Sequence, residues 1–97
     1  MQLALYILGN TVHSRAALAN LRRFCDSHLK GRYELQVIDI LENPDAAEEA
    51  NIVATPTLIK LSPKPICRLI GDLSLTETVL MALGLDNDSN PTEQTTP

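Results

Sequence analysis

The chain opens with an apolar run that predicts a buried strand. Residues 3–8 are apolar throughout, and Gly9 and Asn10 follow them. A run of this length that ends at Gly-Asn is typical of a strand buried on both faces. Residues 33–41, which are rich in β-favouring side chains, predict a second strand.

Between these two strands the apolar positions follow a helical period. The stripe consists of Leu18, Leu21, Cys25 and Leu29. It predicts a helix with Ser14 as its N-cap and Gly31 as its stop. His13 is expected in the loop before this helix and His28 near its end. Because the two strands flank one helix, we expect them to be parallel and joined by a right-handed crossover.

The second half of the chain predicts a short helix and then a hairpin. Asn43 as N-cap and Pro44 in the first turn indicate a helix start, and this acidic helix should run to about Asn51. Residues 55–61 and 66–70 predict two paired strands around a turn that contains two prolines.

A capping box predicts the last helix. Ser74 takes the N-cap position and Glu77 follows three residues later, after a break at Gly71 and Asp72. The helix is apolar and should end at Gly84. The complete order, βαβαββα, is that of a thioredoxin-like α/β fold.

Length and charge narrow the class of protein. The 97 residues suffice for one domain, expected over residues 1–85, and residues 86–97 contain no apolar side chain and predict a disordered acidic tail. The formal net charge of −4 divides into −3 for the tail and −1 for the rest, which holds 9 acids and 8 bases. With no basic footprint and only three aromatic residues, no nucleic-acid partner is expected.

Targeting signals and cysteine usage point to the cytoplasm. The run at residues 3–8 is too short for a signal peptide or a membrane span, and no basic segment precedes it. Cys25 and Cys67 are too few and too far apart for a disulfide framework or a zinc site. We expect two reduced packing cysteines in a cytoplasmic protein that does not bind membranes, with a redox-sensing pair as the alternative.

The loop that carries the chemistry of redox thioredoxins holds no nucleophile here. Residues 9–14 contain no cysteine, whereas a Cys-x-x-Cys at a helix start supplies an activated thiol. His13 beside Ser14 is weak evidence for a hydrolytic site, because no third, orienting group accompanies them. We therefore expect no enzyme activity, catalytic residue, metal or cofactor. The alternative is a thioredoxin-like protein with redox or other weak enzymatic activity.

Pro56 is the residue of the second half with the clearest structural meaning. Thioredoxin-like folds carry a cis proline just before the third strand, and Pro56 stands at that position. We therefore predict a cis bond, with a trans proline opening an edge strand as the alternative.

Three motifs in this order carry a family resemblance. They are Gly9-Asn10-Thr11, Ala54-Thr55-Pro56-Thr57-Leu58 and Ile70-Gly71-Asp72-Leu73-Ser74, and matching segments run across residues 3–85. The chain resembles the KaiB family of circadian clock proteins. The resemblance implies a binding protein whose partner is a KaiC-type ATPase, at a surface for which the kinase SasA competes. A SasA-like sensory adaptor module is the alternative.

The resemblance also implies contact residues for that partner, which are Tyr33, Gln36, Lys60 and Arg68. Where family members usually carry bases, this chain has the neutral residues Ala4, Ala16, Gln36 and Cys67. Loss of charge at an interface slows association and changes partner choice. We therefore expect a divergent paralogue that binds a non-standard KaiC homologue.

The resemblance further implies two folds for one sequence. A homotetramer with the order βαββααβ is expected in equilibrium with a thioredoxin-like monomer, the switch lying after Asn51. The residues expected to matter for it are Pro56, Pro63, Pro65, Gly71, Asp72, Ala82 and Gly84. Isomerisation at the prolines would make the switch slow.

Overall fold

A computed structural model describes residues 1–85, and the predicted acidic tail lies outside the described residues. The elements follow the predicted order βαβαββα. They are β1 (Gln2–Ile7), α1 (Val12–His28), β2 (Glu34–Asp39), α2 (Pro44–Glu49), β3 (Thr57–Ser62), β4 (Cys67–Ile70) and α3 (Thr76–Ala82).

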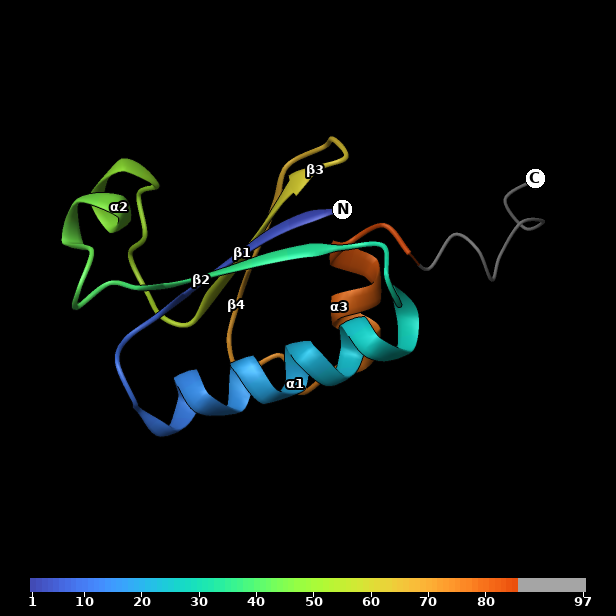
Figure 1. Ribbon diagram of the computed structural model, residues 1–97, viewed down its shortest axis with the longest axis horizontal. Coiled ribbons are helices and arrows are strands. Elements are labelled where there is room, and N and C mark those ends of the chain that lie inside the picture. The colour runs from blue at the N-terminus through green and yellow to red at the C-terminus, as the bar shows by residue number, and fades with distance from the viewer. Residues whose placement is uncertain (86–97) are drawn as a thin grey trace.

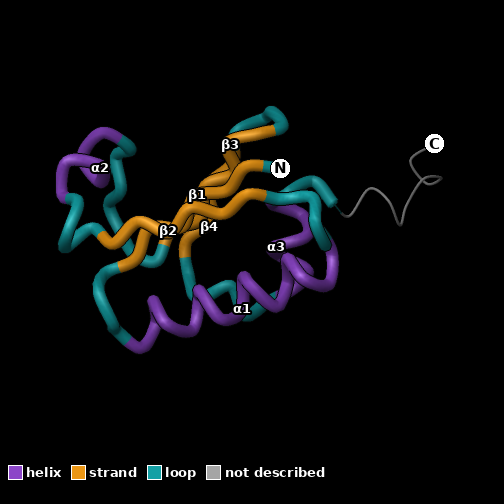
Figure 2. Tube along the Cα trace, viewed as in Figure 1, coloured by secondary structure: helices purple, strands orange, loops and turns teal. Residues whose placement is uncertain are grey.

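The four strands form one mixed sheet with the order β2-β1-β3-β4. β1 and β2 are parallel, as the strand-helix-strand pattern predicts, while β3 is antiparallel to both β1 and β4. Helices α1 and α3 lie on one side of the sheet, and α2 lies away from both (Figure 1). The same layers are seen in Figure 2, where the strands separate α2 from α1.

The register assigns alternate side chains of β1 to opposite faces of the sheet. Leu3 and Leu5 face the helices and pack in one core with Leu21 of α1 and Val79 of α3, and each of these four is at most 1% exposed. Ala4 lies on the other face and is also buried. β1 is therefore covered on both faces, as its apolar run predicts.

Helix α1 begins three residues earlier than predicted, because Thr11 and not Ser14 is its N-cap. Thr11 takes that position, and its Oγ1 accepts a hydrogen bond from the Ser14 N–H at 3.4 Å. The Ser14 hydroxyl is buried and accepts from the Leu8 N–H at 3.0 Å. Ser14 thus ties α1 to the end of β1, and His13 belongs to the first turn of the helix and not to the loop.

The predicted capping box of α3 is also wrong. The Ser74 N–H donates to Oδ1 of Asp72 at 3.0 Å, and Leu75 is the N-cap without a side-chain hydrogen bond. The end of this helix agrees with the prediction, because Gly84 follows it with φ +74°. The Gly84 N–H donates to Met81 and the Leu85 N–H to Leu80, which together form a Schellman turn.

The second half has three cis peptide bonds. The bond before Pro56 is cis, as predicted, and so are the bonds before Pro63 and Pro65 in the turn between β3 and β4. Pro56 is buried at the start of β3, whereas Pro63 and Pro65 are exposed.

Candidate partner-binding surface

Gln36 and Arg68, two of the predicted contact residues, lie on the same face of the sheet. Gln36 pairs with Ala4, Ala4 with Ile59, and Ile59 with Arg68, so the four residues form one row across all four strands. Ala4 and Ile59 are buried in the middle of the row, and the long polar side chains at its two ends are exposed. Three strand spacings separate these ends by about 14 Å. We call this row the cross-strand row.

Arg68 is also a helix cap. Its guanidinium donates to the carbonyl oxygens of Ala50 and Asn51, directly after α2, with 3.4 Å for the bond to Asn51. Asn51 has φ +56°, and the Ile52 N–H donates to Ala47 at 2.9 Å, so α2 ends in a Schellman turn. A cation at a helix C-terminus is stabilised by the helix dipole. Arg68 therefore positions α2 against the edge strand β4.

Lys60 does not lie beside Gln36 and Arg68. Its register partner on β1 is Leu3, which places its side chain on the face that carries α1 and α3. The side chain is only 4% exposed, and Nζ donates to the carbonyl oxygen of Leu83 at 3.5 Å. Lys60 thus caps the C-terminus of α3 in this fold, and its role as a contact residue stays a prediction.

Tyr33 is intermediate in exposure between the two exposed row residues and Lys60. It precedes β2, is half-buried and packs against the main core. The structure therefore places two of the four predicted contact residues, Gln36 and Arg68, on one sheet face at its opposite edges. Tyr33 and Lys60 lie toward the helices.

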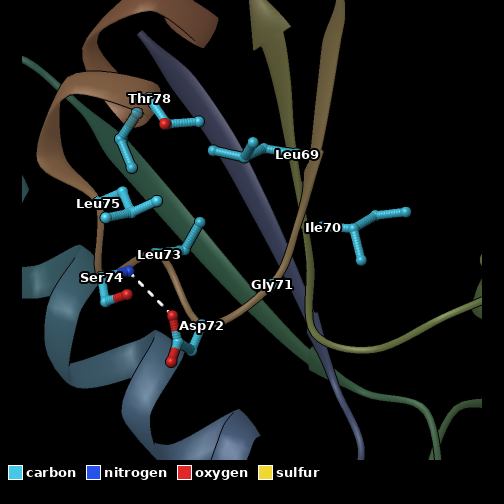
Figure 3. A pocket seen from close by; sticks show the side chains of 9 residues that line it. Leu69, Ile70, Gly71, Asp72, Leu73, Ser74, Leu75 and Thr78 are labelled. Carbon is cyan, nitrogen blue, oxygen red and sulfur yellow. Dashed lines mark hydrogen bonds between the residues drawn. The ribbon is translucent and has the colours of Figure 1, made fainter.

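Two of the predicted switch residues, Gly71 and Asp72, lie in the segment that joins β4 to α3. Gly71 has φ +129°, which is sterically closed to most residues with a side chain, and Leu73 has φ +62° although it is a large residue. Asp72 and Ser74 face each other across this turn in Figure 3. Hydrogen bonds from the side chain and the backbone of Ser74 lower the pKa of the Asp72 carboxyl.

An apolar pocket of about 240 Å³ borders this segment and extends from Leu69 to Val79 (Figure 3). Ile70 and Leu75 on its rim are 57% and 69% exposed. Ala82 is the last residue of α3 and is half-buried, and Gly84 follows two positions later, so these two predicted switch residues lie at the C-terminal end of α3.

The cysteines are placed as packing residues. Cys25 is fully buried on the apolar stripe of α1, and burial together with the nearby Asp26 carboxylate raises the pKa of its thiol to about 11. Cys67 in β4 is half-buried, and its thiol contacts the carbonyl oxygen of Pro65 at 3.6 Å. Neither thiol has the helix N-terminal position that activates a nucleophile.

Residues 1–85 contain neither a metal-binding cluster nor a membrane-spanning helix. In that range no three His, Cys, Asp or Glu side chains come close enough to hold a metal ion. None of the helices described there is both long and apolar enough to cross a membrane.

Sequence reasoning missed that Arg68 and Lys60 cap the ends of α2 and α3. Local patterns predict where α2 and α3 stop, but not that Arg68 reaches Asn51 over 17 positions or that Lys60 reaches Leu83 over 23. The one available signal is Asn51, because asparagine tolerates the left-handed backbone of a helix end.

Comparison with known proteins gives one consistent family. A family model described as the KaiB domain matches residues 4–85. The circadian clock protein KaiB3 of a Synechocystis strain is 54% identical over 84 residues, which cover 87% of this chain and 80% of the relative. The circadian clock oscillator protein KaiB of a Synechococcus strain is 51% identical over 94 residues, which cover 91% and 79%.

Solved structures agree on the fold. The N-terminal domain of SasA from Synechococcus elongatus superposes with a TM-score of 0.69 at 24% identity, covering 95% of this chain and 85% of that domain. Mitochondrial thioredoxin 3 of Saccharomyces cerevisiae gives a TM-score of 0.68 at 15% identity, covering 89% and 76%. The fold is therefore thioredoxin-like.

Proposed function

Because the chain belongs to the KaiB family, we propose that it is a cytoplasmic clock regulator that binds a KaiC-type ATPase and carries out no catalysis itself. The observation that carries the proposal is the KaiB domain match over residues 4–85, which contains every element of the fold except the first two residues of β1. The fully buried thiol of Cys25 and the absence of a cysteine from the loop at residues 9–11 agree with a binding role.

The cross-strand row supports a position for the partner contact. Gln36 and Arg68 are exposed at the two edges of one sheet face, and buried side chains between them form a continuous base. Only Arg68 in this row is charged, so electrostatic attraction to an acidic partner surface is weaker than in relatives with more bases. We propose that the partner is a KaiC homologue of a non-standard type.

A second, tetrameric fold is part of the same proposal. Six large apolar residues are 43% to 90% exposed in the second half of the described chain, namely Val53, Leu61, Ile66, Ile70, Leu75 and Met81. Apolar groups exposed in this number favour burial by another chain. A rearranged tetramer of the order βαββααβ would cover them and would be in equilibrium with the thioredoxin-like monomer.

The residues proposed to influence the switch are the seven predicted from the sequence. We propose that Pro56, Pro63, Pro65, Gly71, Asp72, Ala82 and Gly84 influence the equilibrium. Gly71 and Asp72 lie in the connection that leads into α3, and Ala82 and Gly84 lie at its C-terminal end. This placement supports the proposal, because a helix that becomes a strand must change its backbone conformation together with the turns on both sides of it.

Association kinetics with each KaiC homologue of the host, in ATP and in ADP, test the contact. Gln36→Lys adds a base to the cross-strand row, and we expect it to raise the association rate about two- to tenfold at low salt. Asp26→Asn is the matched control, because it changes the net charge equally but lies on α1, on the other side of the sheet. If the wild-type chain binds no homologue, the proposal is wrong. If both variants act equally, net charge and not the row controls association.

A further inference from the structure

A polar groove lies between α1 and the connection that leads into α3. We call residues 73–76 of this connection the strap. The groove has a volume of about 250 Å³ and is lined by Asn20, Arg23, Phe24, Ser27, His28, Leu73, Ser74 and Thr76. The five lining residues of α1 are spaced as one helix face. Phe24 and Leu73 are buried and give the groove an apolar base, while the polar residues form its two walls.

Neighbouring groups orient the side chains of Arg23 and His28 in the groove. Nη2 of Arg23 donates to Oδ1 of Asn20 at 2.6 Å, and Nδ2 of Asn20 donates to the carbonyl oxygen of Asp72 at 2.8 Å. This contact uses one of the five N–H donors of a guanidinium. The His28 ring packs on Phe24 with 4.5 Å between ring centroids. Both side chains are thus partly organised before any ligand arrives.

The composition of the lining differs from that of the whole chain. The chain carries 12 acidic residues and a net charge of −4, but none of the eight lining residues is acidic. Hydroxyl groups stand on both walls, from Ser27 on α1 and from Thr76 on the strap side, whereas the Ser74 side chain is hydrogen-bonded to the Asp72 carboxylate. The carboxylate of Asp72 accepts from the Ser74 N–H and is not part of the lining.

We propose that this groove binds a tetrahedral oxyanion, either inorganic phosphate or the phosphate group of a small ester. Guanidinium groups bind phosphate through two parallel hydrogen bonds, and hydroxyl donors from two directions suit a tetrahedral anion better than a planar one. The volume is smaller than the roughly 300–1,000 Å³ of pockets for drug-sized ligands, which favours a small anion. The groove lies on the helical side of the sheet, away from the cross-strand row, so the site is separate from the proposed partner contact.

Backbone amide NMR of the full chain tests the site. The titrants are inorganic phosphate, AMP and acetate at one constant ionic strength. We expect phosphate to shift the amide signals of Arg23, Ser27, Ser74 and Thr76 in a saturable way, while acetate leaves them unchanged. AMP distinguishes a monoester ligand from free phosphate, because a groove open to esters binds it at least as tightly as phosphate.

Two adjacent arginines supply the matched variants. Arg23→Gln should weaken phosphate binding about tenfold, as expected for the loss of a charge-assisted bond. Arg22→Gln removes the same charge one position away, outside the groove, and should change the affinity less than twofold. Both residues are exposed, so the fold is expected to persist and the amide spectrum verifies it. Linear shifts without saturation, equal shifts with acetate, or equal losses in the two variants would overturn the proposal.

Discussion

The ammonium group of Lys60 donates a hydrogen bond to the carbonyl oxygen of Leu83, 3.5 Å away, and joins β3 to the C-terminal end of α3. Arg68 makes the equivalent connection from β4 to the end of α2. Two bases on neighbouring strands and on opposite faces of the sheet thus each stabilise one helix end. Their charges hold the two short helices of the second half in place, and only Arg68 also lies at the surface.

Replacing Lys60 by methionine should destabilise the fold. The change removes a charge-assisted hydrogen bond and a cation at a helix C-terminus while it keeps most of the side-chain volume. We expect the free energy of unfolding to fall by about 1–2 kcal/mol in urea denaturation. Lys64→Met in the exposed turn is the control and should have little effect. A Lys60→Met variant more stable than wild type would mean that the cost of burying the ammonium exceeds the value of the cap.

The core between β1 and α1 predicts that truncating Leu21 strongly lowers the stability of the fold. Its side chain is fully buried, so Leu21→Ala should lower the free energy of unfolding by about 2–5 kcal/mol through lost burial and a cavity. Val12→Ala, at a position that is 74% exposed on the same helix, should cost much less. Thermal or urea unfolding of the two variants measures the difference, and equal costs would contradict the described core.

The two cysteines should react at very different rates with a thiol reagent. A pKa of about 11 in place of 9.0 leaves Cys25 about a hundredfold less thiolate near neutral pH, and burial also blocks access. We expect one fast modification, at Cys67, and a slow one that follows unfolding. Mass spectrometry identifies the site, and Cys67→Ser should abolish the fast phase. A fast reaction in that variant would show that Cys25 is accessible.

The lowered pKa of Asp72 predicts a small loss of stability in acid. Hydrogen bonds from Ser74 lower its pKa in the folded state, so the carboxylate contributes stability above its unfolded pKa, about 3.9, and loses it as the pH falls through the lower folded value. The stability difference between wild type and Asp72→Ala should be constant above about pH 5 and shrink on further acidification. Urea titrations at several pH values measure it, and a difference that does not change with pH would refute the ionic contribution.

Much of the fold follows from local patterns. The errors in the prediction come from hydrogen-bond partners that helical and strand periods do not reveal. The apolar run of β1, the stripe of α1 and the glycine after α3 each act within a few residues, and the predicted element order was right. The predicted caps at Ser14 and Ser74 were wrong because both residues bond other nearby groups, the Leu8 amide six positions before Ser14 and the Asp72 carboxylate two positions before Ser74. The partner of Lys60 lies 23 positions away, beyond the reach of a helical or strand period.

Part of the candidate surface was likewise predictable. Family resemblance pointed to Gln36 and Arg68, and only the strand register shows that they share a row. The groove at Arg23 went unnoticed because its second wall comes from the strap, about 50 residues later in the chain. A polar stripe at Asn20, Arg23 and Ser27 is the signal that sequence alone offers for it.

Size exclusion with light scattering tests the proposed function most directly. The chain is mixed with each KaiC homologue of its host, in ATP and in ADP, and the mass of the free chain comes from the same run. The account predicts a free tetramer that gives up subunits to a large complex with one homologue. No complex with any homologue, in either nucleotide, would contradict it.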